Sequence, residues 1–533
     1  MALCVYCRAV DFSALPEPPR WKRLDRAFDD PQLNALSFDA GDSETLHENE
    51  PGLPWQDSLD TLAESAALNC PLCTIVQSAA QDLNDGRQAG RHSSTLYQEF
   101  GADYHFALPL KRLYLTQRFR KGYGFAVFIA SGDSRALLLG NAAFTVEEAS
   151  PLAGKISLRP FCEDSGSSGA MRVVSSWLKN SVGCVGDSGI KLIEPDVVPM
   201  LTTTRTSLHA HISGLFVADL PKTFRDAVSL CRYLGIPYLC IDSLCIIQGD
   251  TKDWARESSR MLNVYSNAYL VIAANHASDS AAGCFHNRPS RMSVNVILAG
   301  IGLVHAQLGA NSDEVLPHNN EFFDEPLTKR AWALQERLLA TCMVHYNNGQ
   351  MYFECRHGIV GDDGCNTDTP YCDLSPVMNH RCSAREALLT WSSIIWNYGD
   401  RNLTKPTGKF PALSGIASLL GGLLKDEYVA GLWSSVMVQG LAWQGQWRPK
   451  LQPINEYIGP SWSWASFEGI AAPNTDPNWK SIAVVEDWKI EEVSPDDPYG
   501  QVKSASMKDS SEQESDRTRD SAQSMVARVM TYV

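Results

Sequence analysis

Residues Leu220 to Phe285 read LPKTFRDAVSLCRYLGIPYLCIDSLCIIQGDTKDWARESSRMLNVYSNAYLVIAANHASDSAAGCF. The first part of this segment has the repeat of an amphipathic helix, with apolar residues at i, i+3, i+4, i+7 and i+10. These residues are Phe224, Ala227, Val228, Cys231 and Leu234. Gly235 follows at a position where glycine commonly ends a helix. We therefore predict a helix that packs one face against a core and ends at Gly235.

Two short apolar runs in the same segment predict buried strands. They cover Pro237 to Ile241 and Ala268 to Ala274. A second helix is expected between them, with Trp254, Ser258, Met261 and Tyr265 along one side. The order helix, strand, helix, strand at this spacing indicates parallel α/β packing.

Polar residues follow the first predicted strand, at the edge where open parallel sheets bind their ligands. Asp242, Ser243, Cys245 and Gln248 are expected at that edge. The candidate binding residues are Asp242, Ser243 and Gln248, joined by Trp254 on the next helix. A purely structural role, in which Asp242 caps the turn after the strand, is the alternative.

An ordered set of sequence blocks resembles the heterokaryon incompatibility (HET) domain of filamentous fungi. The blocks are LPKTFRDA, YLCIDSLCIIQ, DWARESSRM and VYSNAYLVIAA, followed by LTKRAWALQERLL, VHYNNGQMYFEC, DRNLTKPTGKFPALSGIA, AGLW and PSWSWA. The resemblance covers about residues 170 to 506. It implies an α/β core built on a parallel sheet, distantly similar to Toll/interleukin-1-receptor (TIR) domains.

Composition and the resemblance together divide the chain into five parts. These are a Cys-containing N-terminal region at 1–110, a strand-rich segment at 111–183, the HET core at 184–346, a mixed α+β C-terminal region at 347–506, and a tail at 507–533. Asn348-Gly349 predicts a hairpin turn that joins the core to the C-terminal region. The tail is rich in Ser and charged residues, so we expect it to be disordered.

One strand that the resemblance implies is missing. The family's opening strand, roughly aromatic-Val-Ala-Leu-Ser-Tyr/His-Cys-Trp-Gly, should fall between Gly183 and Leu220, where only the piece KLIEPDVVP is a candidate remnant. Losing a central strand would leave unpaired backbone groups in the sheet. Either another strand fills the position, or the domain is defective, or coding sequence has been skipped.

Composition limits the classes of function. The net charge of -15 over 533 residues argues against broad nucleic-acid binding, which needs a basic face. The longest apolar run, Val296 to Val304, is too short to span a bilayer, and the first ten residues do not resemble a secretory signal. Cys231, Cys240 and Cys245 lie in apolar segments and are interpreted as core residues of a protein in a reducing compartment, so we expect a cytoplasmic location.

Two cysteine pairs near the N-terminus predict a metal site. Cys4 and Cys7, like Cys70 and Cys73, are separated by two residues, a spacing that lets both sulfurs of a pair bind one Zn²⁺. Similar pairs precede many HET domains. Two independent pairs of core cysteines are the alternative. A closed four-thiolate zinc site would be structural rather than catalytic.

Glu257 is the candidate catalytic residue, and this assignment also rests on the resemblance. Some TIR domains cleave NAD with a Glu placed four residues after a Trp on a comparable helix; here Glu257 lies three residues after Trp254. A carboxylate can stabilise an oxocarbenium-like centre at the ribose. The alternative is that Glu257 pairs with Lys252, Arg256 or Arg260 on a solvated helix face.

The resemblance implies a role in vegetative incompatibility, in which fusion of genetically unlike fungal cells triggers death of the fused compartment. The HET domain would act there as the death-inducing effector, through self-association or a protein partner. One alternative is a TIR-like enzyme that hydrolyses NAD, its substrate, with Glu257. The other is an inactive, HET-derived binding module.

Overall fold

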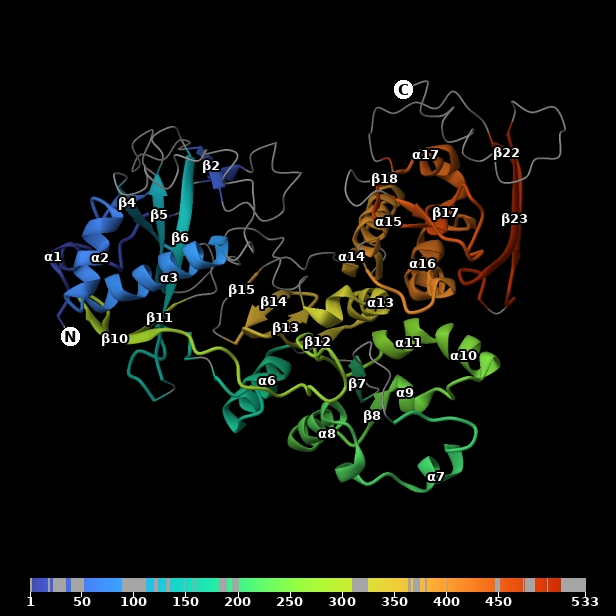
Figure 1. Cartoon of the computed structure of the whole chain (residues 1–533), viewed down its shortest axis with the longest axis horizontal. Coiled ribbons are helices and arrows are strands. Elements are labelled where there is room, and N and C mark those ends of the chain that lie inside the picture. The colour runs from blue at the N-terminus through green and yellow to red at the C-terminus, as the bar shows by residue number, and fades with distance from the viewer. Residues whose placement is uncertain are drawn as a thin grey trace.

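The computed structural model is a mixed α/β protein with several sheets (Figure 1). It describes residues 2–17, 20–22, 35–39, 52–88, 112–118, 123–130, 135–147, 149–156, 158–160, 162–181, 189–193, 201–308, 325–362, 366–367, 374–378, 381–399, 401–445, 451–472, 474, 485–495 and 497–509. Among the helices of these residues, none combines the length and hydropathy that crossing a membrane requires.

A largely antiparallel sheet forms the N-terminal part of the molecule. Its strands follow the order β1 (Arg20–Lys22), β2 (Ala35–Asp39), β6 (Arg135–Thr145), β5 (Gly124–Ala130), β4 (Leu113–Thr116) and β3 (Leu53–Pro54). The helices of this part are α1 (Val5–Arg8), α2 (Leu59–Ala67) and α3 (Pro71–Gln88). Because these strands form one sheet, the predicted boundary between residues 110 and 111 falls inside a single folded unit.

The hairpin of β10 (Ser293–Leu298) and β11 (Gly302–Leu308) extends the same sheet, since β11 pairs with β6. This hairpin contains the long apolar run Val296 to Val304, with Val296 and Val304 buried and Ile297 exposed. Figure 1 shows it beside the N-terminal helices, far along the chain from them. Residues 293–308 therefore belong to the N-terminal unit and not, as predicted, to the core.

The core sheet is mixed rather than wholly parallel. Its strand order is β15 (Asn366–Thr367), β14 (Gly358–Gly361), β13 (Met351–Cys355), β12 (Cys342–Tyr346), β9 (Leu270–Ala273), β7 (Ile190–Ile193) and β8 (Leu239–Ile241). The strands from β12 to β8 pair in parallel, whereas β12 to β15 are antiparallel. The predicted Asn348-Gly349 hairpin is confirmed, and it is the reason why the sheet changes direction at β12.

Strand β7 occupies the position where a strand seemed to be missing. It comes from the piece KLIEPDVVP and pairs in parallel with both β8 and β9, placing Lys191 beside Cys240 on one side and Val271 on the other. Of the three explanations for the missing block, the first therefore applies to the sheet: another strand fills the gap.

Helices cover both faces of the core sheet. On one face, α6 (Ser168–Asn180) and α8 (Lys222–Leu234) pack with Ile190, Leu192, Leu270 and Ile272. On the other, Val271 and Met343 pack with α11 (Met261–Ser266), α13 (Ala331–Leu339) and α16 (Pro411–Leu424). The predicted amphipathic helix is confirmed as α8, which ends at Gly235 with φ of 71°.

The single helix predicted between the two strands is two helices, α10 (Thr251–Ser258) and α11. Ser258 and Ser259 donate their hydroxyls to the carbonyls of Ala255 and Arg256, at 3.1 and 2.9 Å. Such bonds compete with the backbone ladder of a helix. The break between α10 and α11 lies at these serines.

The C-terminal part continues the apolar layer on the second face of the core. It contains α14 (Ser375–Met378), α15 (Ala384–Tyr398), α17 (Met437–Leu441), short strand pairs, and the hairpin of β22 (Val485–Glu492) and β23 (Val502–Asp509). Strand β23 extends three residues into the segment predicted as a tail, because residues 507–509 pair with β22. Residues 510–533 lie outside the described residues.

Candidate functional site

A partly buried ion pair lies at the carboxyl edge of the parallel strands. Asp242 follows β8 directly and begins the short helix α9 (Asp242–Cys245). Its carboxylate pairs with Lys191 of β7, and the Tyr265 hydroxyl lies 3.4 Å from the same carboxylate. The Lys191 side chain is 2% exposed and that of Asp242 is 30% exposed. The pair thus connects the protein interior with the surface where ligands of such sheets bind.

The surroundings of Lys191 keep it charged. Burial lowers the pKa of Lys191, but the charge of Asp242, its hydrogen bond to Lys191 and the charge of Glu336 raise that pKa above its ordinary value. The ammonium also lies 5.2 Å from the centre of the Tyr265 ring, within the range of a cation–π contact. Burial raises the pKa of Tyr265, so its hydroxyl stays protonated and can donate. The arrangement holds the Asp242 carboxylate in one place with one side open to solvent.

The other candidate binding residues after β8 are engaged with a neighbouring loop. Thr203 donates its backbone N–H to the Ser243 carbonyl at 2.8 Å and its hydroxyl to the Leu244 carbonyl at 2.7 Å. Gln248 donates its backbone N–H to the Thr203 carbonyl at 2.7 Å and its side-chain amide to the Ile246 carbonyl at 3.1 Å. The structure therefore brings Ser243 and Gln248 close to Asp242 in one turn, and it holds that turn by backbone contacts.

Trp254 and Glu257 lie on α10. Trp254 meets Trp332 edge to face, with ring centres 6.3 Å apart. The Glu257 carboxylate lies 2.9 Å from the Arg256 guanidinium and 3.5 Å from that of Arg260, and its side chain is 24% exposed. This is the ion-paired arrangement that stands as the alternative to catalysis.

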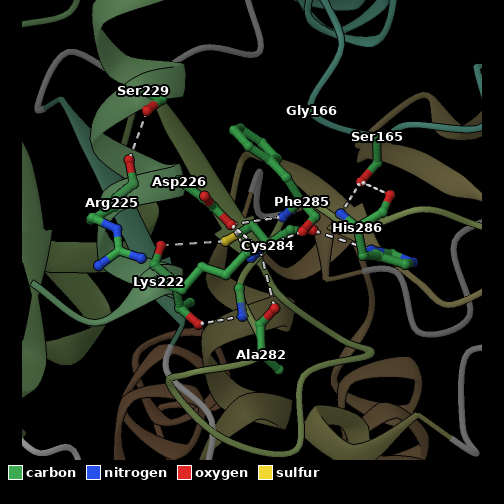
Figure 2. Close-up of polar contacts among 12 residues, drawn as sticks. Ser165, Gly166, Lys222, Arg225, Asp226, Ser229, Ala282, Cys284, Phe285 and His286 are labelled. Carbon is green, nitrogen blue, oxygen red and sulfur yellow. Dashed lines mark hydrogen bonds and ion pairs between the residues drawn. The ribbon is translucent and has the colours of Figure 1, made fainter.

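A second Lys–Asp pair, which sequence reasoning missed, fastens α8 to the end of the quoted segment (Figure 2). The Asp226 carboxylate accepts the backbone N–H groups of Cys284 and Phe285 at 2.9 and 3.0 Å, and the Lys222 ammonium at 2.9 Å. Lys222 also donates to the carbonyls of Ala282 and Phe285, at 3.2 and 2.5 Å. We call this arrangement the α8 clamp. The spacing i, i+4 could have suggested the pair, but its backbone partners carry no sequence signal.

Gly283 is enclosed by the α8 clamp. Its φ is +90°, and a Cβ there would lie 2.0 Å from the Lys222 ammonium and 2.5 Å from the Asp226 carboxylate. Only glycine fits this backbone and this space. The α8 clamp therefore has a structural role, since its groups are used in holding residues 282–285.

The four predicted metal-ligating cysteines come together in the N-terminal unit. The sulfurs of Cys4, Cys7, Cys70 and Cys73 all lie within 4.8 Å of one another. Cys73 is 3.6 Å from both Cys4 and Cys7, and Cys7 is 3.6 Å from Cys70. A disulfide would need about 2.05 Å, whereas thiolates at the corners of a tetrahedron around zinc are about 3.8 Å apart, given a Zn–S bond of about 2.3 Å.

The hydrogen bonds around these four cysteines suit the binding of a metal cation. Hydrogen bonding with Cys7 and Cys73 lowers the pKa of Cys70, whereas hydrogen bonding with Cys70 and Cys73, together with burial, raises the pKa of Cys7. The amide of Gln56 donates to the Cys73 sulfur at 3.3 Å, and the Cys4 backbone N–H donates to the Cys70 sulfur at 3.4 Å. Donors aimed at the sulfurs favour the thiolate form, which is the form that binds metal. The cluster could hold a metal ion.

Comparison with known proteins agrees with the sequence blocks. Residues 199–336 match the family described as Heterokaryon incompatibility protein (HET). No curated protein and no solved structure gives a significant match. The matched segment contains the α8 clamp, Asp242, α10 and the start of α13, while β7 with Lys191 lies just before it. The family match therefore identifies a HET domain within residues 199–336 of the chain.

Proposed function

We propose that this chain is the death-inducing effector of a heterokaryon incompatibility reaction, acting in the cytoplasm after fusion of unlike fungal cells. The observation that carries the proposal is the family match over residues 199–336. The pairing of the parallel strands supports it, because β7 pairs with both β8 and β9 and so joins them into one sheet. This favours a working domain over a defective, HET-derived binding module. The effector would act through self-association or through a protein partner.

Inducible expression of the full chain in a filamentous fungus tests the effector role. We expect arrested growth and cell death on induction. Asp242→Asn should relieve the arrest, because it removes the charge at the sheet edge, whereas Lys252→Met on the exposed surface of α10 should not. Unchanged growth at an expression level confirmed by immunoblotting would overturn the proposal.

A TIR-like enzyme that hydrolyses NAD is the second candidate. A partly exposed carboxylate, Asp242, stands at the ligand-binding edge of parallel strands, and a second, Glu257, lies on α10. Either could stabilise positive charge that develops at a ribose. Purified full chain incubated with NAD should then release nicotinamide, measured by chromatography. Release that survives Glu257→Gln but not Asp242→Asn would move the catalytic role to Asp242, and absence of release would remove this candidate.

We also propose that the cysteine cluster binds a structural zinc ion. Cys4, Cys7, Cys70 and Cys73 would supply all four ligands, leaving no open position for catalysis. Elemental analysis of the purified chain should find one zinc per molecule, and Cys73→Ser should lower both the zinc content and the thermal stability of the N-terminal unit. Zinc-free protein with unchanged stability would contradict the assignment.

A further inference from the structure

Two cysteines lie in contact at the carboxyl edge of the core sheet. Cys240 is the middle residue of β8 and Cys245 is the last residue of α9. The Cys240 thiol donates to the Cys245 sulfur across 3.4 Å. Sequence reasoning placed both in the core, but Cys240 is only partly buried and Cys245 is exposed, because α9 leaves the sheet directly after β8.

The two sulfurs have different chemical character. The hydrogen bond from Cys240 lowers the pKa of Cys245 to about 6, and the charge of Lys191 acts in the same direction. The same hydrogen bond raises the pKa of Cys240, which keeps its proton. The Lys191 ammonium lies 3.4 Å from the Cys240 sulfur. An exposed thiolate beside a protonated thiol is the arrangement of a reactive cysteine with a resolving partner.

Two other cysteines of the core differ from this pair in exposure and in thiol pKa. Cys231 and Cys284 are buried. Burial raises the pKa of Cys231 to about 11 and that of Cys284 well above its ordinary value. Buried thiols with raised pKa values are inert. The reactivity that we infer for the turn after β8 therefore does not extend to Cys231 and Cys284.

We propose that Cys240 and Cys245 form a redox-active dithiol, which hydrogen peroxide converts into an intramolecular disulfide. The Cys245 thiolate attacks one peroxide oxygen, the O–O bond breaks, and the departing hydroxide takes up a proton to leave as water. The Cys245 sulfenic acid that results is attacked by the Cys240 sulfur. The S–O bond then breaks, and the hydroxide leaves as water with the proton of Cys240. Two thiols and one peroxide thus give one disulfide and two waters.

The disulfide would act on the sheet edge itself. Bond formation shortens the sulfur separation from 3.4 Å to about 2.05 Å. The residues between the two cysteines include Asp242 and Ser243, so closure constrains the turn that holds the Asp242 carboxylate against Lys191. The oxidation state of the pair is thereby coupled to the geometry of the candidate site. This modification goes beyond the effector role and does not depend on it.

Peptide mass spectrometry tests the dithiol directly. The reduced full chain is exposed to hydrogen peroxide, blocked with N-ethylmaleimide under denaturing conditions, and digested with trypsin. Cleavage after Arg232 and Lys252 releases a peptide, Tyr233 to Lys252, whose two cysteines are Cys240 and Cys245. We expect this peptide to escape alkylation and to be lighter than its dithiol form by two hydrogen atoms. Cys231 and Cys284 should remain alkylated in the same sample.

Two variants separate the roles of the cysteines. With Cys240→Ser, oxidation should stop at the Cys245 sulfenic acid, which dimedone traps. With Cys245→Ser, Cys240 should react at least tenfold more slowly than Cys245 does in Cys240→Ser, because Cys240 is partly buried whereas Cys245 is exposed. Circular dichroism of both variants checks that the fold is kept. Full alkylation of Tyr233–Lys252 after peroxide treatment that oxidises other thiols, or equal reactivity of the two single variants, would overturn the proposal.

Discussion

Two Lys–Asp pairs lie in the same core and differ in what surrounds them. In the α8 clamp, both partners come from one helix, and the Asp226 side chain is 14% exposed and bonded to two backbone N–H groups. The pair of Lys191 and Asp242 joins two parallel strands, and its carboxylate is 30% exposed. The first pair is held by several hydrogen bonds within the chain, whereas the second presents a positioned charge to solvent.

This difference suggests how structural and functional roles divide in the domain. A carboxylate that receives two backbone N–H groups and an ammonium ion fixes a loop and has little capacity left for a ligand. A carboxylate held by a buried lysine at the carboxyl edge of parallel strands is placed where ligands bind. We therefore expect changes in the α8 clamp to affect folding first and changes at Lys191 and Asp242 to affect activity first.

Gly283→Ala should give the largest loss of stability. The new Cβ would displace the Lys222 ammonium and the Asp226 carboxylate, and it would strain a backbone with positive φ, for a total of about 3 kcal/mol. Gly235→Ala is the matched control, since its φ is +71° but no atom lies within 4 Å of the new Cβ; it should cost about 1 kcal/mol. Thermal unfolding followed by circular dichroism measures both. Equal losses would mean that the α8 clamp tolerates displacement.

Replacing each lysine by methionine compares the two pairs directly. Lys222→Met removes bonds to Asp226 and to two carbonyls and should destabilise the protein by about 2 kcal/mol. Lys191→Met places an apolar chain of similar size in a buried site while Asp242 can still be hydrated, so we expect a loss below about 1 kcal/mol. Growth arrest in the fungal host should nevertheless be lost with Lys191→Met. Retained arrest would show that the pair of Lys191 and Asp242, too, is only structural.

Sequence reasoning predicted the local elements of this core well and its long-range pairings poorly. Helix α8, its end at Gly235, and strands β8 and β9 follow from periodicity and short apolar runs. Strand β7 was uncertain because it is four residues long with a lysine inside, and the charge becomes acceptable only when Asp242 is brought beside it. The local sequence does not predict that β10 and β11 join the N-terminal sheet, because β11 pairs with β6, which lies far away in the chain.

In the candidate site, too, the features with a local sequence signal were predictable and the long-range contacts were not. The cysteine cluster was predictable because metal ligands in knuckles have a characteristic spacing, and the fold places all four sulfurs together. The position of Asp242 followed from the rule for parallel strands. Its partner Lys191 and the contact between Cys240 and Cys245 depend on strand register and on the direction of α9, which spacing along the chain does not specify.

Glu257→Gln should have the smallest effect on stability and a decisive effect on mechanism. Its pairs with Arg256 and Arg260 involve arginine side chains that are 58% and 60% exposed, so their loss should change the free energy of unfolding by less than about 0.5 kcal/mol. Glu64→Gln on the exposed surface of α2 controls for the substitution itself. If the effector acts through protein contacts alone, growth arrest should persist with Glu257→Gln; if it hydrolyses NAD with this residue, arrest and nicotinamide release should disappear together. A loss of stability well above the control would instead assign Glu257 to the fold, and Asp242 would then be the remaining candidate carboxylate for catalysis.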